Sequence, residues 1–233
     1  PRSTLSPSSA ASDVYKRQDI DVSFNNIINV DTGVYLEHCS NVSITLNYMK
    51  VTDLGVDAAA DCQDLSITLN VIEGARIGIY LCWTVRSDVY VNIVYNFTSS
   101  GVELIGCDGV VVDSNIIFNM TDTAKGIFVA RGEMPGIVEI TNNFIGQFVA
   151  IFNPSVPPGG TGIWFASMNC SFIFNNTIFY VKTGIYIWNS YDNVIAYNNI
   201  TSCTEYGLKS EDSYYNVIHH NNFFNNTVNA WDS

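Results

Sequence analysis

The segment GIYIWNSYDNVIAYNNI, residues 184–200, decides the fold. Apolar and polar residues alternate in GIYI and NVIAYN and β-branched residues dominate, so the local period is two, which predicts short strands. Two adjacent asparagines, Asn198 and Asn199, lie inside this pattern. An inward amide without a partner would cost about 1–3 kcal/mol. The fold must therefore supply a partner for a buried asparagine.

The same pattern recurs along the chain every 22–23 residues, with two longer units. A glycine followed by an aliphatic residue marks each unit, at Gly33, Gly55, Gly78, Gly101, Gly126, Gly162, Gly184 and Gly207. About 11 residues later comes a second aliphatic column, at Ile44, Ile67, Val89, Val112, Ile140, Ile173, Ile195 and Ile218. About 16 residues after the glycine comes a third, at Met49, Ile72, Val94, Ile117, Phe144, Ile178, Ile200 and Phe223. Such alignment over eight units indicates a repeat architecture.

Each unit is long enough for three short strands joined by tight turns but too short for two helices, and no helical period of 3.6 appears. Stacking such coils about 4.8 Å apart places like residues above one another in parallel sheets. The sequence therefore predicts an all-β fold, a right-handed single-stranded parallel β-helix of about 8–9 coils.

Every unit also carries an asparagine two residues before the third column. These asparagines are Asn47, Asn70, Asn92, Asn115, Asn142, Asn176, Asn198 and Asn221. In stacked coils each side-chain amide can donate to the carbonyl oxygen of the asparagine one coil away, so a buried column pairs with itself. Asparagine also tolerates the left-handed backbone that bends require. Where asparagine is doubled, we expect one residue in this ladder and the other facing solvent at the turn.

Two units exceed the repeat length. The segment ARGEMPG, residues 130–136, predicts an excursion at a turn. The segment GQFVAIFNPSVPPGG, residues 146–160, is rich in proline and glycine and predicts a loop that leaves the coil. Loops on repeat scaffolds often carry binding residues.

Residues 1–18, PRSTLSPSSAASDVYKRQ, share no pattern with the rest of the chain and contain three of its ten basic residues. The part SSAASDVYKRQ matches the in-frame translation of a DNA-sequencing adapter. We therefore expect residues 1–18 to be non-native and disordered. Residues 19–233 are then expected to form one solenoid domain, a metagenomic fragment of a longer gene with both ends cut.

Residues 19–233 carry seven basic and 21 acidic residues. This acidity argues against nucleic-acid partners and against anionic membranes, which both require clusters of lysine and arginine. No apolar run reaches the roughly 18 residues that a membrane helix needs, so no membrane span is expected. The sequence leaves the oligomeric state open.

The repeat unit G-[IV]-x-[LI]…N-V-x-[IL]-x-x-N-x-[IF] and the segment YYNVIHHNNFFNNTVNAWDS, residues 214–233, resemble NosD-type parallel β-helix repeat proteins. The resemblance spans residues 19–233. It implies membership of the wider set of carbohydrate-binding proteins and sugar hydrolases, which are common among secreted and surface proteins. The founding members of the NosD type are periplasmic proteins linked to copper-site assembly.

Copper would require clustered histidine, cysteine or methionine. The sequence offers His38 beside Cys39 and the pair His219 and His220, but no two-ligand motif repeats at metal spacing. We therefore expect no metal site and no cofactor. The six cysteines contain no CxxC motif. Cys39 and Cys62 fall near equivalent positions of successive coils, where either a disulfide or stacked free thiols would fit.

The position two residues after each repeat glycine is expected to face outward on one sheet. It holds Tyr35, Asp57, Tyr80, Glu103, Phe128, Trp164, Tyr186 and Lys209, with Trp83 and Trp188 close by. Aromatic rings interleaved with carboxylates can stack pyranose rings and accept hydrogen bonds from sugar hydroxyls. The sequence therefore predicts a non-catalytic polysaccharide or glycan site. The alternative is that these rings only pair along the sheet and stabilise its strands.

Two other functions remain open. One is a polysaccharide lyase, glycoside hydrolase or epimerase, for which Asp57 and Glu103 are the best candidate acids. The motifs N-T-D, D-D, G-H-G, R-I-K and D-P-H-D, typical of such enzymes, are absent. The other is a structural spacer in a surface layer or adhesin.

Acidity, the resemblance and seven N-x-[ST] motifs favour an extracellular, periplasmic or cell-surface location. The motifs begin at Asn41, Asn96, Asn119, Asn169, Asn175, Asn199 and Asn225.

Overall fold

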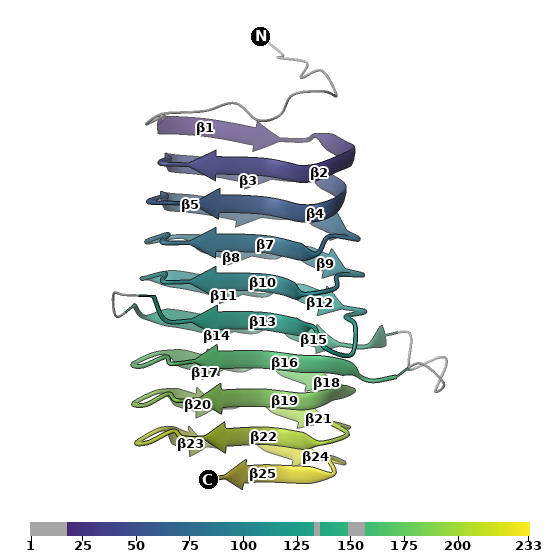
Figure 1. The fold of residues 1–233 in the computed structure, drawn as a ribbon, viewed down its shortest axis with the longest axis vertical. Helices are drawn as coiled ribbons and strands as arrows, with labels where there is room; N and C mark the ends of the chain where they lie inside the picture. The colour runs from purple at the N-terminus through teal and green to yellow at the C-terminus, as the bar shows by residue number, and fades with distance from the viewer. Residues whose placement is uncertain (1–17, 133–135, 149–156) are drawn as a thin grey trace.

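The computed structural model describes residues 18–132, 136–148 and 157–233, and these residues form the predicted right-handed parallel β-helix (Figure 1). Strands of successive coils stack in parallel and in register, and the coils present three sheet faces. Of residues 1–18, only Gln18 is described, and it begins the first strand. Within the described residues, no helix is long and apolar enough to cross a membrane.

Face A is a separate sheet of nine strands in the described part of the chain. Its strands are β1 (Gln18–Ser23), β3 (Ser40–Thr45), β5 (Gln63–Thr68), β8 (Asp88–Tyr90), β11 (Val110–Asp113), β14 (Val138–Thr141), β17 (Phe172–Phe174), β20 (Val194–Ala196) and β23 (Val217–His219).

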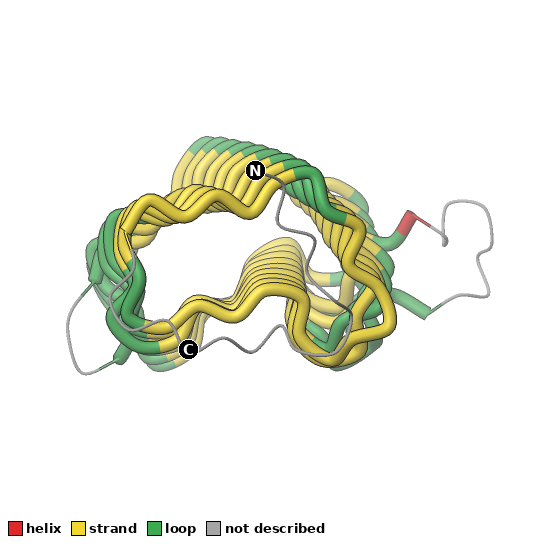
Figure 2. The backbone as a smooth tube through the Cα atoms, turned by 90° about the horizontal axis from the view of Figure 1, so that it is seen from above, coloured by secondary structure: helices red, strands yellow, loops and turns green. Residues whose placement is uncertain are grey.

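Faces B and C belong to one continuous sheet because two long strands turn the corner between them. These strands are β2 (Asn26–Glu37) and β4 (Tyr48–Ala59), and the two ends of β4 pair with β6 and β7 respectively. Face B continues through β6 (Val71–Glu73), β9 (Ile93–Tyr95), β12 (Ile116–Phe118), β15 (Phe144–Gly146), β18 (Thr177–Phe179), β21 (Asn199–Thr201) and β24 (Asn222–Phe224). Face C continues through β7 (Ile77–Cys82), β10 (Ser100–Ile105), β13 (Lys125–Ala130), β16 (Gly159–Ala166), β19 (Val181–Trp188), β22 (Tyr206–Glu211) and β25 (Val228–Asp232). Seen along the axis, the coils superpose and the backbone of face C bends inward (Figure 2).

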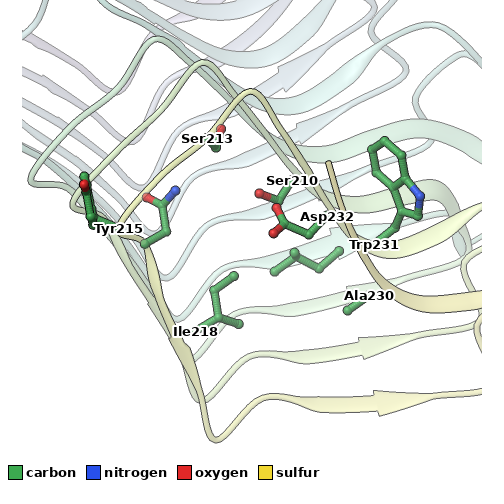
Figure 3. Close-up of a pocket in the computed structure, with 9 residues that line it drawn as sticks. Ser210, Ser213, Tyr215, Ile218, Ala230, Trp231 and Asp232 are labelled. Carbon is green, nitrogen blue, oxygen red and sulfur yellow. The ribbon is translucent and has the colours of Figure 1, made fainter.

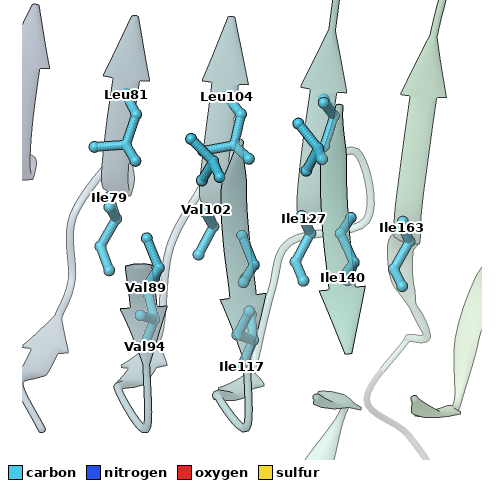
Figure 4. Close-up of a cluster of buried hydrophobic side chains, with 14 of the residues drawn as sticks. Ile79, Leu81, Val89, Val94, Val102, Leu104, Ile117, Ile127, Ile140 and Ile163 are labelled. Atoms are coloured by element: carbon cyan, nitrogen blue, oxygen red, sulfur yellow. The ribbon is translucent and has the colours of Figure 1, made fainter. Parts of the chain in front are cut away.

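The core consists of aliphatic columns that run along the solenoid, and Figure 4 shows the part of them in the middle coils. Ile79, Val102, Ile127 and Ile163 follow one another on face C, and their side chains are fully buried. One member of the third column was predicted wrongly, because Ile145 and not Phe144 lies in the core. The excursion in residues 130–136 lengthens this unit, so a fixed count from its glycine no longer finds the core position.

The repeat glycines are required by close packing between coils. At Gly184, a Cβ atom would lie 2.4 Å from the carbonyl oxygen of Gly207 on the next coil and 2.4 Å from Cγ2 of Ile200 inside the core. Both distances are far below van der Waals contact. Any larger residue at this position would push successive coils apart.

The asparagine ladder supplies the partners that the sequence requires. Asn198 donates its side-chain amide to Oδ1 of Asn221 at 2.9 Å and to the carbonyl oxygen of Ile173 at 2.9 Å, while its own Oδ1 accepts from the backbone and side chain of Asn176. The ladder starts one coil earlier than predicted, at Asn25. Its members are Asn25, Asn47, Asn70, Asn92, Asn115, Asn143, Asn176, Asn198 and Asn221.

Asn142 was therefore assigned to the ladder wrongly. Asn143 is buried and joins Asn115 to Asn176, whereas Asn142 is exposed and has a left-handed φ of 56°. The left-handed residue precedes the ladder asparagine in other coils too, as at Tyr197 before Asn198. The bend thus depends on the residue before the amide, and the ladder asparagine itself keeps an ordinary backbone.

The excursion and the loop are only partly described. Residues 133–135 and 149–156, within the excursion and the loop predicted at 130–136 and 146–160, lie outside the described residues. At the base of the longer segment, the ring of Phe148 lies 5.0 Å from Phe118, 5.3 Å from Phe144 and 5.4 Å from Phe179. These contacts place Phe148 against the outer surface of face B.

Candidate functional site

Face C carries the predicted outward residues in one continuous row along the solenoid. Strand pairing aligns each with its neighbour one coil away and extends the row by Trp231. We call this the outer row, and it comprises Tyr35, Asp57, Tyr80, Glu103, Phe128, Trp164, Tyr186, Lys209 and Trp231. Its side chains are half-buried or exposed, so successive residues cover one another while their outer surfaces face solvent.

The C-terminal half of the outer row is a stack of rings and cations. The ring centroid of Trp164 lies 5.3 Å from Phe128 and 5.2 Å from Tyr186. Nζ of Lys125 lies 5.4 Å from the ring centroid of Trp164, and Nζ of Lys209 lies 4.8 Å from that of Tyr186. These distances suit aromatic and cation–π contacts.

Glu211 fixes the end of this stack. Its Oε2 accepts hydrogen bonds from Lys209 Nζ and from the Tyr186 hydroxyl, both at 2.7 Å. The Lys209 contact is the main reason that the pKa of Glu211 lies below its usual value. Burial is the main reason that the pKa of Tyr186 is raised, and its bond to Glu211 adds to this. Tyr186 therefore stays protonated and holds its ring in place.

The N-terminal half alternates aromatic rings with carboxylates. Asp57 lies between Tyr35 and Tyr80, and among the described residues its buried Oδ1 has no hydrogen-bond partner. Burial, followed by the charge of Asp53, raises the pKa of Asp57. Oε2 of Glu103, one rung beyond Tyr80, accepts a hydrogen bond from Ser100 at 2.8 Å. This half thus presents an acceptor whose hydrogen-bonding capacity the protein does not use.

The two tryptophans expected beside the outer row have different environments. Trp83 follows β7, and its ring covers Gly106 and Gly132, where an added Cβ would lie 3.1 and 2.9 Å from ring atoms. Trp83 therefore fills the space left by two glycines in a turn. Trp188 lies two residues beyond Tyr186 on β19 and is 41% exposed, so it widens the aromatic surface.

Face B carries a polar cluster around Glu73 that the sequence did not predict. Glu73 accepts hydrogen bonds from the hydroxyls of Tyr48 and Tyr95 at 2.6 and 2.9 Å, and from Lys50 at 3.0 Å. These bonds, led by the one from Tyr48, lower the pKa of Glu73 to about 2. Glu73 is therefore held as a carboxylate and cannot act as an acid near neutral pH. The signal in the sequence was Lys50, Glu73 and Tyr95 at equivalent positions of successive coils.

Two cavities are lined by residues outside the outer row, except that Trp231 contributes to the second. One, of about 380 Å³, lies on face A between Glu139, Asn142 and the rings of Phe172 and Phe174. The other, of about 280 Å³, lies inside the last coil (Figure 3). In Figure 3 the ring of Trp231 lies on the opposite side of its strand from this interior, consistent with its place in the outer row.

A sequence profile of the family described as NosD, periplasmic copper-binding protein, matches residues 18–178 and 149–233. The chain belongs to the NosD family. No match was found among curated protein sequences.

Solved structures share the fold of this NosD family member at low sequence identity. The A-module of the mannuronan C-5 epimerase AlgE4 from Azotobacter vinelandii superposes with a TM-score of 0.59 and 12% identity, over 91% of this chain and 78% of that one. An alginate lyase from Paenibacillus sp. str. FPU-7 gives a TM-score of 0.54 and 13% identity, over 90% and 92% of the two chains. Identities this low establish a common fold only.

The described residues of this NosD family member do not provide a set of donor atoms that suits copper, the metal named in the family description. No three His, Cys, Asp or Glu side chains come together there in an arrangement that could hold a metal ion. Nδ1 of His219 and Nδ1 of His220 lie 2.7 Å apart and bond to each other. His38 lies beside Asp61 and Glu37, at 3.7 and 4.0 Å. The described residues therefore do not fit a copper site.

Proposed function

We propose that this NosD family protein binds a polysaccharide along the outer row of face C, in an extracellular or periplasmic setting. One observation carries the proposal: nine successive coils place six aromatic residues and two carboxylates in one row at the spacing of the coils. Such a row matches a ligand that is itself long and repetitive. A polysaccharide chain lying along the solenoid axis would contact several coils at once.

The chemistry of the outer row suits saccharide rings. The apolar face of a pyranose stacks on aromatic rings such as Trp164 and Tyr186, and its hydroxyl groups need acceptors and donors nearby. Asp57 Oδ1 and Trp164 Nε1 have no hydrogen-bond partner in the described residues, and both atoms are buried. A sugar hydroxyl would reach either atom only after its side chain turned outward. That turn would give each atom the partner that it lacks in the free protein.

The comparisons support this proposal indirectly. The two solved structures are described as a mannuronan C-5 epimerase A-module and an alginate lyase, so at least two proteins that share this fold act on polysaccharides. The family description is periplasmic, which agrees with a location outside the cytoplasm.

Affinity electrophoresis of the protein through gels containing neutral, amino-sugar and uronate polysaccharides tests the proposal. We expect retardation by at least one polysaccharide, and we expect it to disappear in Tyr80→Ala/Trp164→Ala. The matched control is Tyr90→Ala/Phe172→Ala, which removes two exposed rings from face A. Equal retardation of both double variants would refute a site on the outer row. No retardation in any gel would favour a structural spacer.

One observation favours a second candidate, a polysaccharide-cleaving or epimerising enzyme. Asp57 and Glu103 lie on the same row with Tyr80 between them, two rungs or about 10 Å apart along the backbone. Burial raises the pKa of Asp57, as a general acid requires. The spacing resembles that of carboxylate pairs in inverting glycosidases. If this candidate holds, Asp57→Asn will abolish release of reducing or unsaturated sugars and retain binding.

A further inference from the structure

Two buried cysteines occupy the same turn position in successive coils. Backbone hydrogen bonds define this turn column, because the amide after each member bonds to the carbonyl oxygen of the member one coil earlier: Gln63 to Cys39, Val85 to Cys62 and Asp108 to Thr84. The column therefore runs Cys39, Cys62, Thr84, Cys107. Cys39 is 1% exposed and Cys62 is fully buried.

Both thiols are buried and bond to backbone carbonyl oxygens of their own turns. The thiol of Cys39 donates to the carbonyl oxygen of Glu37 at 3.2 Å, and that of Cys62 donates to Ala59 at 3.5 Å. Burial raises the pKa of Cys62 to about 11, and the charge of the nearby Cys39 thiolate would add to the rise. Neighbouring coils are about 4.8 Å apart, within the 4.4–6.8 Å between Cα atoms that a disulfide spans.

We propose that Cys39 and Cys62 form a disulfide when the protein meets a disulfide oxidant. With oxidised glutathione, the Cys39 sulfur attacks one glutathione sulfur and breaks the glutathione S–S bond, which releases one reduced glutathione. The Cys62 sulfur then attacks the Cys39 sulfur and releases the second. The protein loses two thiol protons and two electrons, and one oxidised glutathione becomes two reduced ones.

The bond would fasten the first two coils of the described solenoid together. It would link the turn between β2 and β3 to the turn between β4 and β5, 23 residues further along the chain. A cross-link of that span restricts the unfolded chain and so stabilises the folded one. Disulfides persist in the periplasm and outside the cell, where the family description and the proposed function place such a protein.

The same column contains an internal control. Cys107 has Thr84 one coil before it and Gly136 against its backbone on the other side, since a Cβ on Gly136 would meet the Cys107 carbonyl oxygen. Cys107 is buried like Cys62, but neither neighbour in the column carries a thiol. A Cys107→Ser variant therefore changes a buried turn cysteine and leaves the proposed pair intact.

The test is peptide mapping of the whole chain after incubation in glutathione redox buffer at pH 8.5 and after refolding in the same buffer. Free thiols are alkylated in denaturant before non-reducing digestion. We expect a peptide that links Cys39 to Cys62 in the unsubstituted protein and in Cys107→Ser, and none in Cys62→Ser. Oxidation should raise Tm by roughly 5 °C in the first two proteins only. Recovery of Cys39 and Cys62 as separate alkylated peptides from the unsubstituted protein, or a link from either one to another cysteine, would overturn the proposal.

Discussion

The two halves of the outer row share one backbone geometry and differ in chemistry. In the N-terminal half, Tyr35 and Tyr80 flank Asp57, whose buried oxygen lacks a partner in the described residues. In the C-terminal half, Trp164 packs between Phe128 and Tyr186, and lysines cover the rings. In the first half, Asp57 Oδ1 lacks a hydrogen-bond donor; in the second half, the rings and lysines contact one another and only Trp164 Nε1 lacks an acceptor in the described residues. A solenoid thus fixes where side chains lie and leaves their chemistry free to change from coil to coil.

The largest effect is expected at the ladder between the two halves, where Asn143 in the coil of Phe128 accepts hydrogen bonds from Asn115 in the coil of Glu103. Asn143→Gly leaves the Asn115 amide groups without their shared acceptor. We expect a loss of about 3 kcal/mol in the free energy of unfolding by urea. Asn142→Gly should change it by less than about 1 kcal/mol, because glycine accepts the left-handed backbone there. Equal losses would show that the ladder does not pass through Asn143.

The next largest effect is a difference in polysaccharide affinity between a variant of the C-terminal half and a variant of the N-terminal half. Trp164→Ala should weaken polysaccharide binding about tenfold or more, because it removes the central ring of the platform. Asp57→Ala should weaken binding by only a few-fold, because one hydrogen bond to a sugar hydroxyl is lost. Isothermal titration calorimetry with one polysaccharide measures both variants. A larger loss in Asp57→Ala would reverse the assignment of the two halves.

A third prediction compares two carboxylates whose contributions to stability change with pH in opposite directions. The pKa of Glu73 is about 2, below its unfolded value of about 4.3, so its contribution to stability is present above pH 4.3 and lost as the pH falls towards 2. The pKa of Asp57 is raised, so its ionised form costs stability at neutral pH and this cost disappears as the pH falls below about 3.9.

Glu73→Gln should therefore lower the free energy of unfolding at pH 7 by about 1 kcal/mol, and Asp57→Asn should raise it by a similar amount. Both differences should shrink in urea titrations towards pH 2 to 3. A loss of stability in Asp57→Asn at pH 7 would show that its carboxylate has a partner in solution.

The smallest effect is expected at the end of the platform. Lys209→Met keeps most of the alkyl chain over Tyr186 and removes the charge that pairs with Glu211. We expect a loss of about 0.5 kcal/mol, reduced by added salt, because partly exposed ion pairs contribute little. Thermal unfolding at low and high salt measures it. A loss that salt leaves unchanged would indicate packing and not charge.

The repeat was enough to predict the fold, because residues at equivalent positions, such as Val34, Val56 and Ile79, have the same buried environment in every coil. It failed at Asn142 and Phe144, where extra residues change the count within one unit. It also placed the outer row, but it could not foresee that Trp83 covers Gly106 and Gly132, since this contact joins three coils through a turn. The Glu73 cluster was missed for a related reason. Its members are of different residue types, so no single column of like residues marks it.

The most direct test of the polysaccharide site is a titration of intrinsic tryptophan fluorescence with the panel of polysaccharides. Trp164 and Trp231 belong to the outer row, and Trp188 lies beside it on β19. We predict a saturable change in emission with at least one polysaccharide, reduced by more than half in Trp164→Phe. Emission that stays unchanged throughout the panel, in a protein whose circular dichroism shows the intact β-helix, would contradict binding on this face.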